Sequence, residues 1–261
     1  MGEYDGFAVN VDGTVGWLTI DRPDKRNAVT SAMWQVLPDV LAGLAADPAV
    51  KVVVVTGAGP SFSAGADIAD LVAGDDPADP MAAIRAHNLR AQRALREFPK
   101  PTVAMIRGHC IGGGLEIAAC CDLRFADRTA TFGVTPARIG VVYPPEAIRS
   151  LVDLAGPATA KYLLFSGELL TADEAYAKGL VDRVLDADSL EDDVRRFAGV
   201  LLSRSQLTIH AVKETVAALL DGTDPEPRAR QRFLETFTSG ELPEGVAAFR
   251  EKRPPRFAWA P

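Results

Sequence analysis

Apolar and polar residues follow one another in a pattern that predicts strands and helices in alternation. Two short apolar runs within residues 7–20 predict two strands joined by a turn. A helix is expected from Thr30 or Ser31, either of which is a suitable N-cap, to about Ala46. The continuous apolar run at residues 52–55 is typical of a strand that is buried on both faces. This order of elements predicts an α/β fold.

The same rhythm continues along the chain and then becomes mainly helical. Residues 81–97 have helical periodicity, and strands are expected at residues 101–106 and 122–126. From Glu146 onward helix signals dominate, among them a capping box at residues 171–174. The C-terminal third is therefore expected to be built from helices.

Composition and charge narrow the class of protein. The chain has 261 residues, of which 48% are hydrophobic, so it can form a sizeable core. A formal net charge of −7 opposes nonspecific binding to nucleic acid, and no nucleic-acid partner is expected. No apolar stretch approaches the roughly 18 residues of a membrane span, and the N-terminus lacks a basic region followed by an apolar one. The expectation is a cytoplasmic protein without a membrane partner.

The metal-binding residue types are few and scattered. Cys110, Cys120 and Cys121 lack the paired spacing of a metal site, and the adjacent pair is better explained as small helix residues than as a disulfide. The three histidines are far apart in the sequence. No metal and no redox cofactor are expected.

Two glycine-containing segments carry the strongest chemical signal. Residues 63–67 and 111–116 each follow a strand-like run and open a helix, which in the second case continues to Cys121. Each segment alone is equally well explained as a tight turn. Together they can place two backbone N–H groups around one developing oxyanion, since glycine permits close approach and helix N-termini attract negative charge. The spacing fits neither a Rossmann fingerprint nor a phosphate-binding P-loop.

With these segments in place, the chain resembles the crotonase superfamily, also called the enoyl-CoA hydratase/isomerase family. The resemblance covers nearly the whole chain, with motifs at residues 21–28, 61–68, 108–116 and 245–257. It implies a spiral of ββα units over residues 1–200. It also implies a C-terminal helical region, residues 201–261, that closes the site and builds homotrimers or dimers of trimers.

The resemblance assigns a role to the glycine segments. It implies that the backbone N–H groups of Ala66 and Gly113 form an oxyanion hole for the carbonyl of an acyl-CoA thioester. Glu116 stands where hydratases carry one of two catalytic carboxylates, although a carboxylate in a first helical turn also simply complements the helix dipole. Coenzyme A enters as part of the substrate, so no separate cofactor is implied.

Other positions match the part of the family that contacts coenzyme A. Cationic side chains suit phosphate recognition. Without the resemblance, Lys25 and Arg26 are better explained as a solvated turn, and the resemblance reverses that preference. For Lys252 a solvated basic end is an equally good explanation. The backbone segment near adenine and the C-terminal lysine complete the match, and the resemblance implies that this lysine can reach coenzyme A across a subunit boundary. The residues concerned are Lys25, Arg26, Ala64, Asp67, Ile68 and Lys252.

One departure from the family pattern concerns the second carboxylate. Alignment of residues 132–140 places Pro136 where hydratases carry glutamate, and proline has no proton to exchange. Tyr143 matches the active-site tyrosine of methylmalonyl-CoA decarboxylases, but Ala66 stands where those enzymes have histidine. Glu146 offers another route, because a helix that begins near residues 144–145 would turn it toward the same pocket. Its alternative explanation is an ordinary acidic helix start.

The sequence therefore predicts an acyl-CoA enzyme of the hydratase/isomerase family that stabilises a thioester enolate. Decarboxylation of a malonyl-type CoA thioester is the alternative within the family. A protein that has kept the fold but only binds a CoA ligand or RNA is the alternative outside it. Acyl chain length stays open, since neither the mobile loop expected at residues 68–80 nor the C-terminal helices carry a sharp motif.

Overall fold

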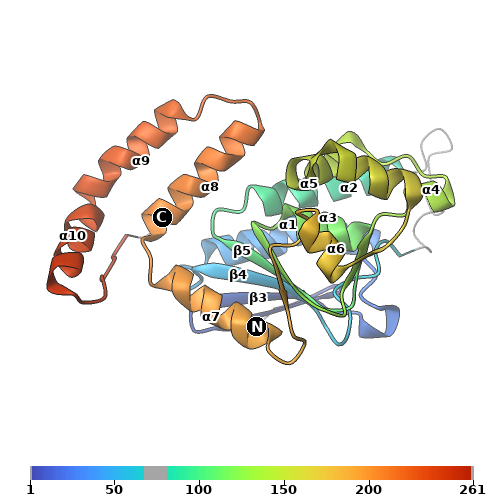
Figure 1. Ribbon diagram of the computed structural model, residues 1–261, viewed down its shortest axis with the longest axis horizontal. Coiled ribbons are helices and arrows are strands. Elements are labelled where there is room, and N and C mark those ends of the chain that lie inside the picture. The colour runs from blue at the N-terminus through green and yellow to red at the C-terminus, as the bar shows by residue number, and fades with distance from the viewer. Residues whose placement is uncertain (1, 68–80, 260–261) are drawn as a thin grey trace.

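The structure, a computed structural model, describes residues 2–67 and 81–259 (Figure 1). In these ranges the strands form a large sheet in the order β1-β2-β3-β4-β5-β7-β10 and a small sheet in the order β6-β8-β9. The large sheet contains β1 (Gly2–Tyr4), β2 (Phe7–Asp12), β3 (Val15–Ile20), β4 (Val52–Gly57), β5 (Thr102–Ile106), β7 (Leu123–Asp127) and β10 (Arg183–Leu185). The small sheet contains β6 (His109–Ile111), β8 (Thr131–Gly133) and β9 (Leu170–Thr171).

The pairing of the strands separates an antiparallel edge from a parallel centre. Strands β1, β2 and β3 pair antiparallel, whereas β3, β4, β5, β7 and β10 pair parallel. In the small sheet β6 pairs parallel with β8, and β9 is antiparallel to β8. The mixed α/β fold predicted from the sequence is confirmed.

Helices account for most of the remaining described chain. The N-terminal half contains the 3₁₀ turn η1 (Pro23–Lys25), α1 (Ser31–Ala46), α2 (Ala82–Arg96) and α3 (Gly113–Cys120). The C-terminal half contains α4 (Pro136–Ile139), α5 (Pro145–Ser166), α6 (Ala172–Ala177), α7 (Leu190–Leu202), α8 (Gln206–Leu220), α9 (Glu226–Thr238) and α10 (Glu241–Glu251). None of the helices in these described ranges is long and apolar enough to cross a membrane.

Local sequence signals explain where several helices begin. The side chain of Thr30 caps α1 by accepting a hydrogen bond of 3.2 Å from the amide of Met33. The capping box predicted at residues 171–174 is present, since Thr171 and Glu174 exchange hydrogen bonds at the start of α6. Both starts are therefore confirmed as the sequence pattern predicts them.

The central strand β4 begins with four consecutive valines because both faces of the sheet are covered. Val53 and Val55 of β4 belong to the larger core cluster, which includes side chains of α1, α2 and α3. Val54 belongs to a second cluster on the opposite face, with Leu190 and Val194 of α7. Figure 1 shows α1, α2 and α3 on one side of the sheet and α7 on the other. A strand between two such layers gains from an apolar side chain at every position.

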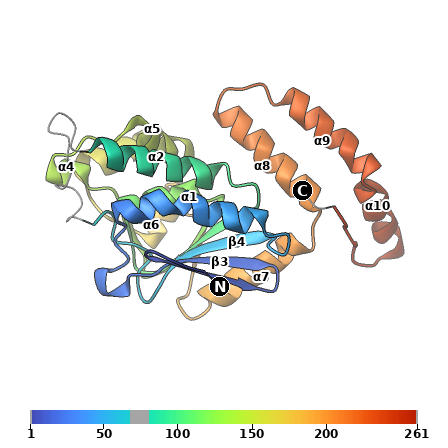
Figure 2. The ribbon, with the colours of Figure 1, turned by 180° about the vertical axis from the view of Figure 1, so that it is seen from behind.

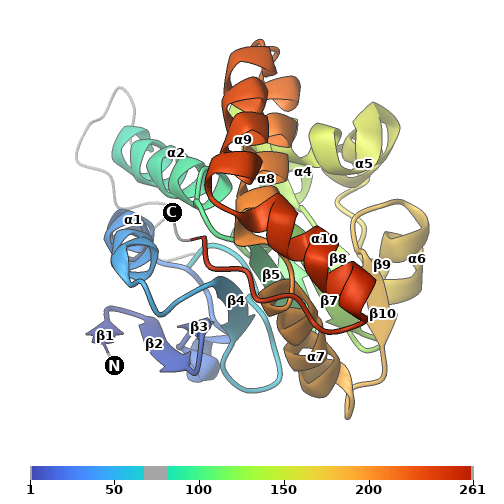
Figure 3. The same ribbon diagram turned by 90° about the vertical axis from the view of Figure 1, so that its left-hand side faces the viewer.

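The last three helices form an arm that projects from one end of the sheet (Figure 2). The root of the arm is held by Lys213 of α8, whose Nζ donates to Oδ2 of Asp122 at 2.7 Å and to the carbonyl of Lys100 at 3.0 Å. Viewed from the arm, α9 and α10 stand in front of the strands (Figure 3). Arg149 of α5 also forms an ion pair of 3.2 Å with Asp221 at the end of α8, so α8 is held to the core at two places.

Candidate active site

The two glycine-containing segments lie side by side at the carboxyl ends of β4 and β5. A parallel bridge joins Ser63 to Cys110, with the amide of Ser63 donating to the carbonyl of His109 at 2.7 Å. The amide of Ile111 donates back to the carbonyl of Ser63 at 3.0 Å. Segments that are about 50 residues apart in the sequence thus share a short main-chain ladder. Their proximity makes one joint site possible.

The glycines are required because the two backbones touch. A Cβ added to Gly65, whose φ is 104°, would lie 2.9 Å from the carbonyl oxygen of Ile111. A Cβ added to Gly114 would lie 2.7 Å from the Cβ of Ser63. No side chain fits at either contact without displacing main chain.

The amides of Ala66 and Gly113 meet at this contact. The amide nitrogen of Ala66 lies 3.6 Å from the point where a Cβ on Gly113 would stand. Gly113 is the first residue of α3, so its N–H has no partner within the helix. Neither amide donates to another group within residues 2–67 and 81–259. The result is a pair of adjacent donors at a helix N-terminus, where negative charge is favoured.

Glu116 extends from the first turn of the same helix into the core. It is only 7% exposed, and its Oε2 accepts hydrogen bonds from Nδ2 of Asn88 at 2.9 Å and from Nε2 of Gln92 at 2.8 Å. Burial raises the pKa of Glu116 above its ordinary value, because it removes the charged form from water. The hydrogen bonds from Asn88 and the interaction with Tyr143 oppose this shift but do not cancel it.

Asn88 and Gln92 are site residues that the sequence pattern does not reveal. They lie four residues apart on α2, and in the sequence they belong to the polar positions of an amphipathic helix. In the structure Gln92 is only 2% exposed. Two carboxamides with i, i+4 spacing beside the buried Ala91 and Leu95 are the one signal that could have identified them.

Tyr143 reaches the same place from the segment before α5. Its hydroxyl lies 3.5 Å from the point where a Cβ on Gly112 would stand. Burial, together with the neighbouring charge of Glu116 and a hydrogen bond to it, raises the pKa of Tyr143 well above its ordinary value. The phenol therefore stays protonated near neutral pH and is available as a hydrogen-bond donor.

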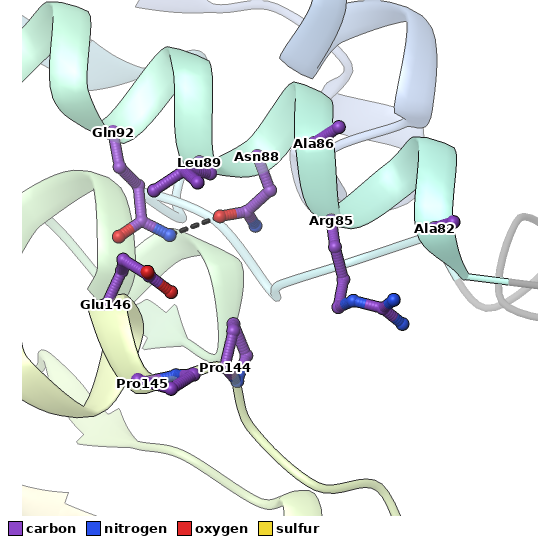
Figure 4. Close-up of a pocket in the computed structure, with 9 residues that line it drawn as sticks. All are labelled: Ala82, Arg85, Ala86, Asn88, Leu89, Gln92, Pro144, Pro145 and Glu146. Carbon is purple, nitrogen blue, oxygen red and sulfur yellow. Dashed lines mark hydrogen bonds between the residues drawn. The ribbon is translucent and has the colours of Figure 1, made fainter. Parts of the chain in front are cut away.

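Glu146 lines a pocket of about 280 Å³ between α2 and the start of α5 (Figure 4). The helix begins at Pro145, with Pro144 as N-cap, so Glu146 lies in its first turn. Asn88 and Gln92, the two partners of Glu116, line the same pocket. Glu116 and Glu146 are thus both next to the carboxamides of α2.

Pro136, at the position where the family pattern has glutamate, opens the short helix α4 and is buried. Its fixed φ suits the first position of a helix, which is a structural reason for proline at this point. It brings no titratable group to the site.

The residues expected to contact coenzyme A are only partly brought together. Lys25 and Arg26 are exposed in a turn that is held against the first glycine segment, since the amide of Ala64 donates to the carbonyl of Arg26 at 2.9 Å. Asp67 forms an ion pair of 3.0 Å with Arg22. Ile68 and the loop expected at residues 68–80 lie outside the described residues.

Lys252 lies apart from the other residues of this group. It caps the C-terminal end of α10, in the projecting arm, and is exposed. Figure 1 shows α10 at the opposite end of the molecule from α3. Within one chain it does not approach the glycine segments.

Comparison with known proteins places this site in a family. A family model described as enoyl-CoA hydratase/isomerase matches residues 10–259. A crotonyl-CoA hydratase from Syntrophomonas wolfei is 32% identical, over 97% of this chain and 98% of its own length. The chain belongs to the enoyl-CoA hydratase/isomerase family. The resemblance on which the sequence analysis relied is therefore confirmed, and the protein is an acyl-CoA enzyme of this family.

Solved structures of the family have the same fold. An enoyl-CoA hydratase/isomerase family protein from Hyphomonas neptunium is 34% identical and has a TM-score of 0.92, covering 97% of this chain and 98% of that chain. An enoyl-CoA hydratase/carnithine racemase from Magnetospirillum magneticum is 33% identical and has a TM-score of 0.93, covering 98% and 96%. The crotonase-like α/β architecture is thereby confirmed.

The raised pKa of Glu116 predicts a pH-dependent cost to stability. Because the folded protein holds the proton more tightly than the unfolded chain, stability falls as the pH rises from the unfolded value, about 4.3, through the folded pKa. Glu116→Gln should remove this loss, so its free energy of unfolding relative to the parent should increase with pH. The expected gain is about 1.4 kcal/mol for each unit by which the pKa is raised. Urea denaturation of both proteins at pH 5 and pH 8 measures it, and a difference that does not change with pH would contradict the assignment.

Proposed function

We propose that this enzyme binds the carbonyl oxygen of an acyl-CoA thioester between the amides of Ala66 and Gly113 and stabilises the enolate formed there. The observation that supports it most is the adjacency of two N–H groups that have no partner in the described part of the chain, with a buried carboxylate, Glu116, one turn away. Fixed donors in a water-excluded site stabilise developing negative charge strongly, because they need no reorganisation during the reaction. Glu116 then lies where it can exchange a proton near the α- or β-carbon.

For hydration of an enoyl thioester, the steps follow from these groups. The Glu116 carboxylate takes a proton from water, the water oxygen bonds to the β-carbon, and the electron pair of the double bond moves toward the thioester oxygen. The α-carbon of the enolate then takes a proton from a carboxyl group, which restores the carbonyl and gives a 3-hydroxyacyl thioester. Glu146 is our candidate for this second group, since it lines the pocket beside the carboxamide partners of Glu116. A relative named crotonyl-CoA hydratase supports hydration of a short enoyl chain.

The same proposal assigns binding of the coenzyme A portion of the substrate. Lys25 and Arg26 offer cationic groups to its phosphates, and the backbone at residues 64–67 lies next to that turn. Asp67 contributes indirectly, because its ion pair with Arg22 fixes the turn. Lys252 belongs to this site only if a neighbouring subunit supplies it. Coenzyme A arrives with the substrate, and the proposed reaction uses no further cofactor.

Decarboxylation of a malonyl-type thioester is a second candidate, favoured by the position of Tyr143. Its hydroxyl stands next to Gly112 and Glu116, so it can orient a carboxylate or protonate an enolate after CO₂ leaves. The two reactions share the enolate and differ in what is exchanged at the α-carbon.

A turnover screen separates the candidate reactions. Crotonyl-CoA, a longer enoyl-CoA and methylmalonyl-CoA are incubated with the enzyme, and products are analysed by mass spectrometry with chromatographic separation of isomers. We expect a gain of water on crotonyl-CoA, lost at least about 100-fold in Glu116→Gln and reduced less than about tenfold in Tyr143→Phe. Loss of CO₂ from methylmalonyl-CoA that depends on Tyr143 rather than Glu116 would favour the second candidate.

Steric replacement tests the oxyanion site, since backbone donors cannot be removed by alanine substitution. A Cβ at position 113 would lie 3.1 Å from Cζ2 of Trp34 and would stand over the Ala66 amide. Gly113→Val should therefore lower kcat at least about 100-fold. Gly199→Val is the matched control, because a Cβ there meets no atom within 4 Å. Turnover that is equal in the two folded variants would rule out this site.

We propose further that the arm mediates a homotrimer or a dimer of trimers. Large apolar side chains on α8 and α9 are exposed, with Phe233 at 62% and Leu219 at 62%. A single apolar surface of this kind favours association.

The solution mass tests the assembly. Light scattering should give at least three times the chain mass of 27.8 kDa, and Phe233→Asp should reduce it, while the control Val11→Asp on the exposed side of β2 should not. A mass of one chain at micromolar concentration would contradict the trimer.

A further inference from the structure

The carboxamides of Asn88 and Gln92 converge on a single oxygen of Glu116. Nδ2 of Asn88 and Nε2 of Gln92 both donate to Oε2, at 2.9 Å and 2.8 Å. Nε2 of Gln92 also donates to Oδ1 of Asn88, so the three side chains form a closed triangle, one edge of which is drawn in Figure 4. Two donors on one carboxylate oxygen fix its plane and favour its charged form.

The orientation of the Gln92 carboxamide leaves its own oxygen without a hydrogen bond among the described residues. Its Nε2 faces Glu116, because the reverse orientation would set oxygen against carboxylate oxygen. Its Oε1 is consequently turned away, and it is buried without a hydrogen-bond partner among the described residues. A buried, unpaired acceptor destabilises the fold, and an apolar side chain of the same shape would avoid that loss. Glutamine at this position is therefore explained by what it does for Glu116 and not by folding stability.

The location of the pair connects it with the reaction. Both carboxamides line the pocket beside the start of α5, opposite Pro144 and Glu146 (Figure 4). We assign this pocket to the acyl chain of the proposed substrate. Asn88 and Gln92 line it and also donate to Glu116, so they connect the carboxylate with that volume.

We propose that Asn88 and Gln92 are positioning residues that hold the Glu116 carboxylate in one plane and keep it ionised, so that it can accept a proton during turnover. This inference rests on the proposed function, in which Glu116 is the proton acceptor. It adds two residues that act only through Glu116.

Other titratable groups lie near Glu116 and could also affect how activity depends on pH. Tyr143 faces it from the segment before α5, and burial raises its pKa. Cys120 faces it from α3 itself, and burial, opposed in part by Arg96, raises the pKa of that thiol to about 11. Glu146 lines the adjoining pocket from α5. Because the tyrosine and the thiol titrate far above neutral pH, the acid limb belongs to a carboxyl group, and repeating the profile in a Glu146→Gln background tests whether that group is Glu116.

The test measures kcat/KM for crotonyl-CoA as a function of pH in Gln92→Met and Asn88→Leu. Removing a donor from the ionised form raises the pKa of Glu116, so the acid limb should move upward by about one pH unit for each donor. Activity on the acid limb should fall about tenfold, and most of it should return at high pH, where Glu116 is ionised in every variant. The Tm of Gln92→Met should stay within about 4 °C of the parent, since the substitution also removes the unpaired acceptor. Gln35→Met, at an exposed position of α1, is the matched control and should change neither quantity.

A second readout does not depend on turnover. Infrared difference spectra against Glu116→Gln follow the protonated carboxyl of Glu116 and give its titration directly. An upward shift of that titration in Gln92→Met supports the proposal, and an unchanged titration overturns it whether or not crotonyl-CoA is converted. A shifted titration without turnover on any acyl-CoA would instead overturn the proposed function. A uniform loss of activity at every pH, with an unmoved acid limb, would show that the pair is merely structural and would also overturn the proposal.

Discussion

The close contact of two main-chain segments is the constraint on which the site depends. Residues 61–66 and 107–114 leave neighbouring parallel strands and remain paired beyond the sheet, through hydrogen bonds of 2.7 to 3.0 Å. Gly65 and Gly114 are the positions where any Cβ would collide with the opposite segment. The contact fixes the N-terminus of α3, and with it the amide pair and Glu116 one turn later. Each of these features would move if the two backbones were farther apart.

The environment of Glu116 is a balance of opposing effects. Burial disfavours the charged carboxylate, whereas the donors on α2, Tyr143 and the N-terminal end of α3 favour it. Burial outweighs the donors, because the pKa remains raised. A carboxyl group that titrates closer to neutral pH is a better proton-transfer catalyst than a fully solvated one. The same burial that lowers folding stability is therefore what suits the residue to acid and base chemistry.

Much of this arrangement could be predicted from the sequence, and the reasons for the rest are physical. Local propensity and backbone sterics depend on residues that are adjacent in the sequence. They determine the cap at Thr30, the apolar strand β4 and the glycine segments. The strands β6 and β8 have three residues each, too few for a period-2 pattern. The role of Gln92 depends on which polar residues of α2 pack inward. Tertiary packing decides this, and the sequence of the helix alone does not. Lys252 depends on the arm, whose place relative to the site is set by contacts at Lys213 and Asp221.

The site residues come from several elements, which explains how the site tolerates Pro136 at the position where the family pattern has glutamate. The enolate stabilisation that we propose uses backbone groups, so side-chain changes that leave the glycine contact intact would preserve it. The proton transfers that we propose use side chains from α2, α3 and the start of α5, and none of them comes from α4. Proline at the first position of α4 supports that helix and costs the oxyanion site nothing. Under the proposed function, the carboxyl and hydroxyl groups that face the pocket decide the reaction of this chain, while the charge that is stabilised is the same in each candidate reaction.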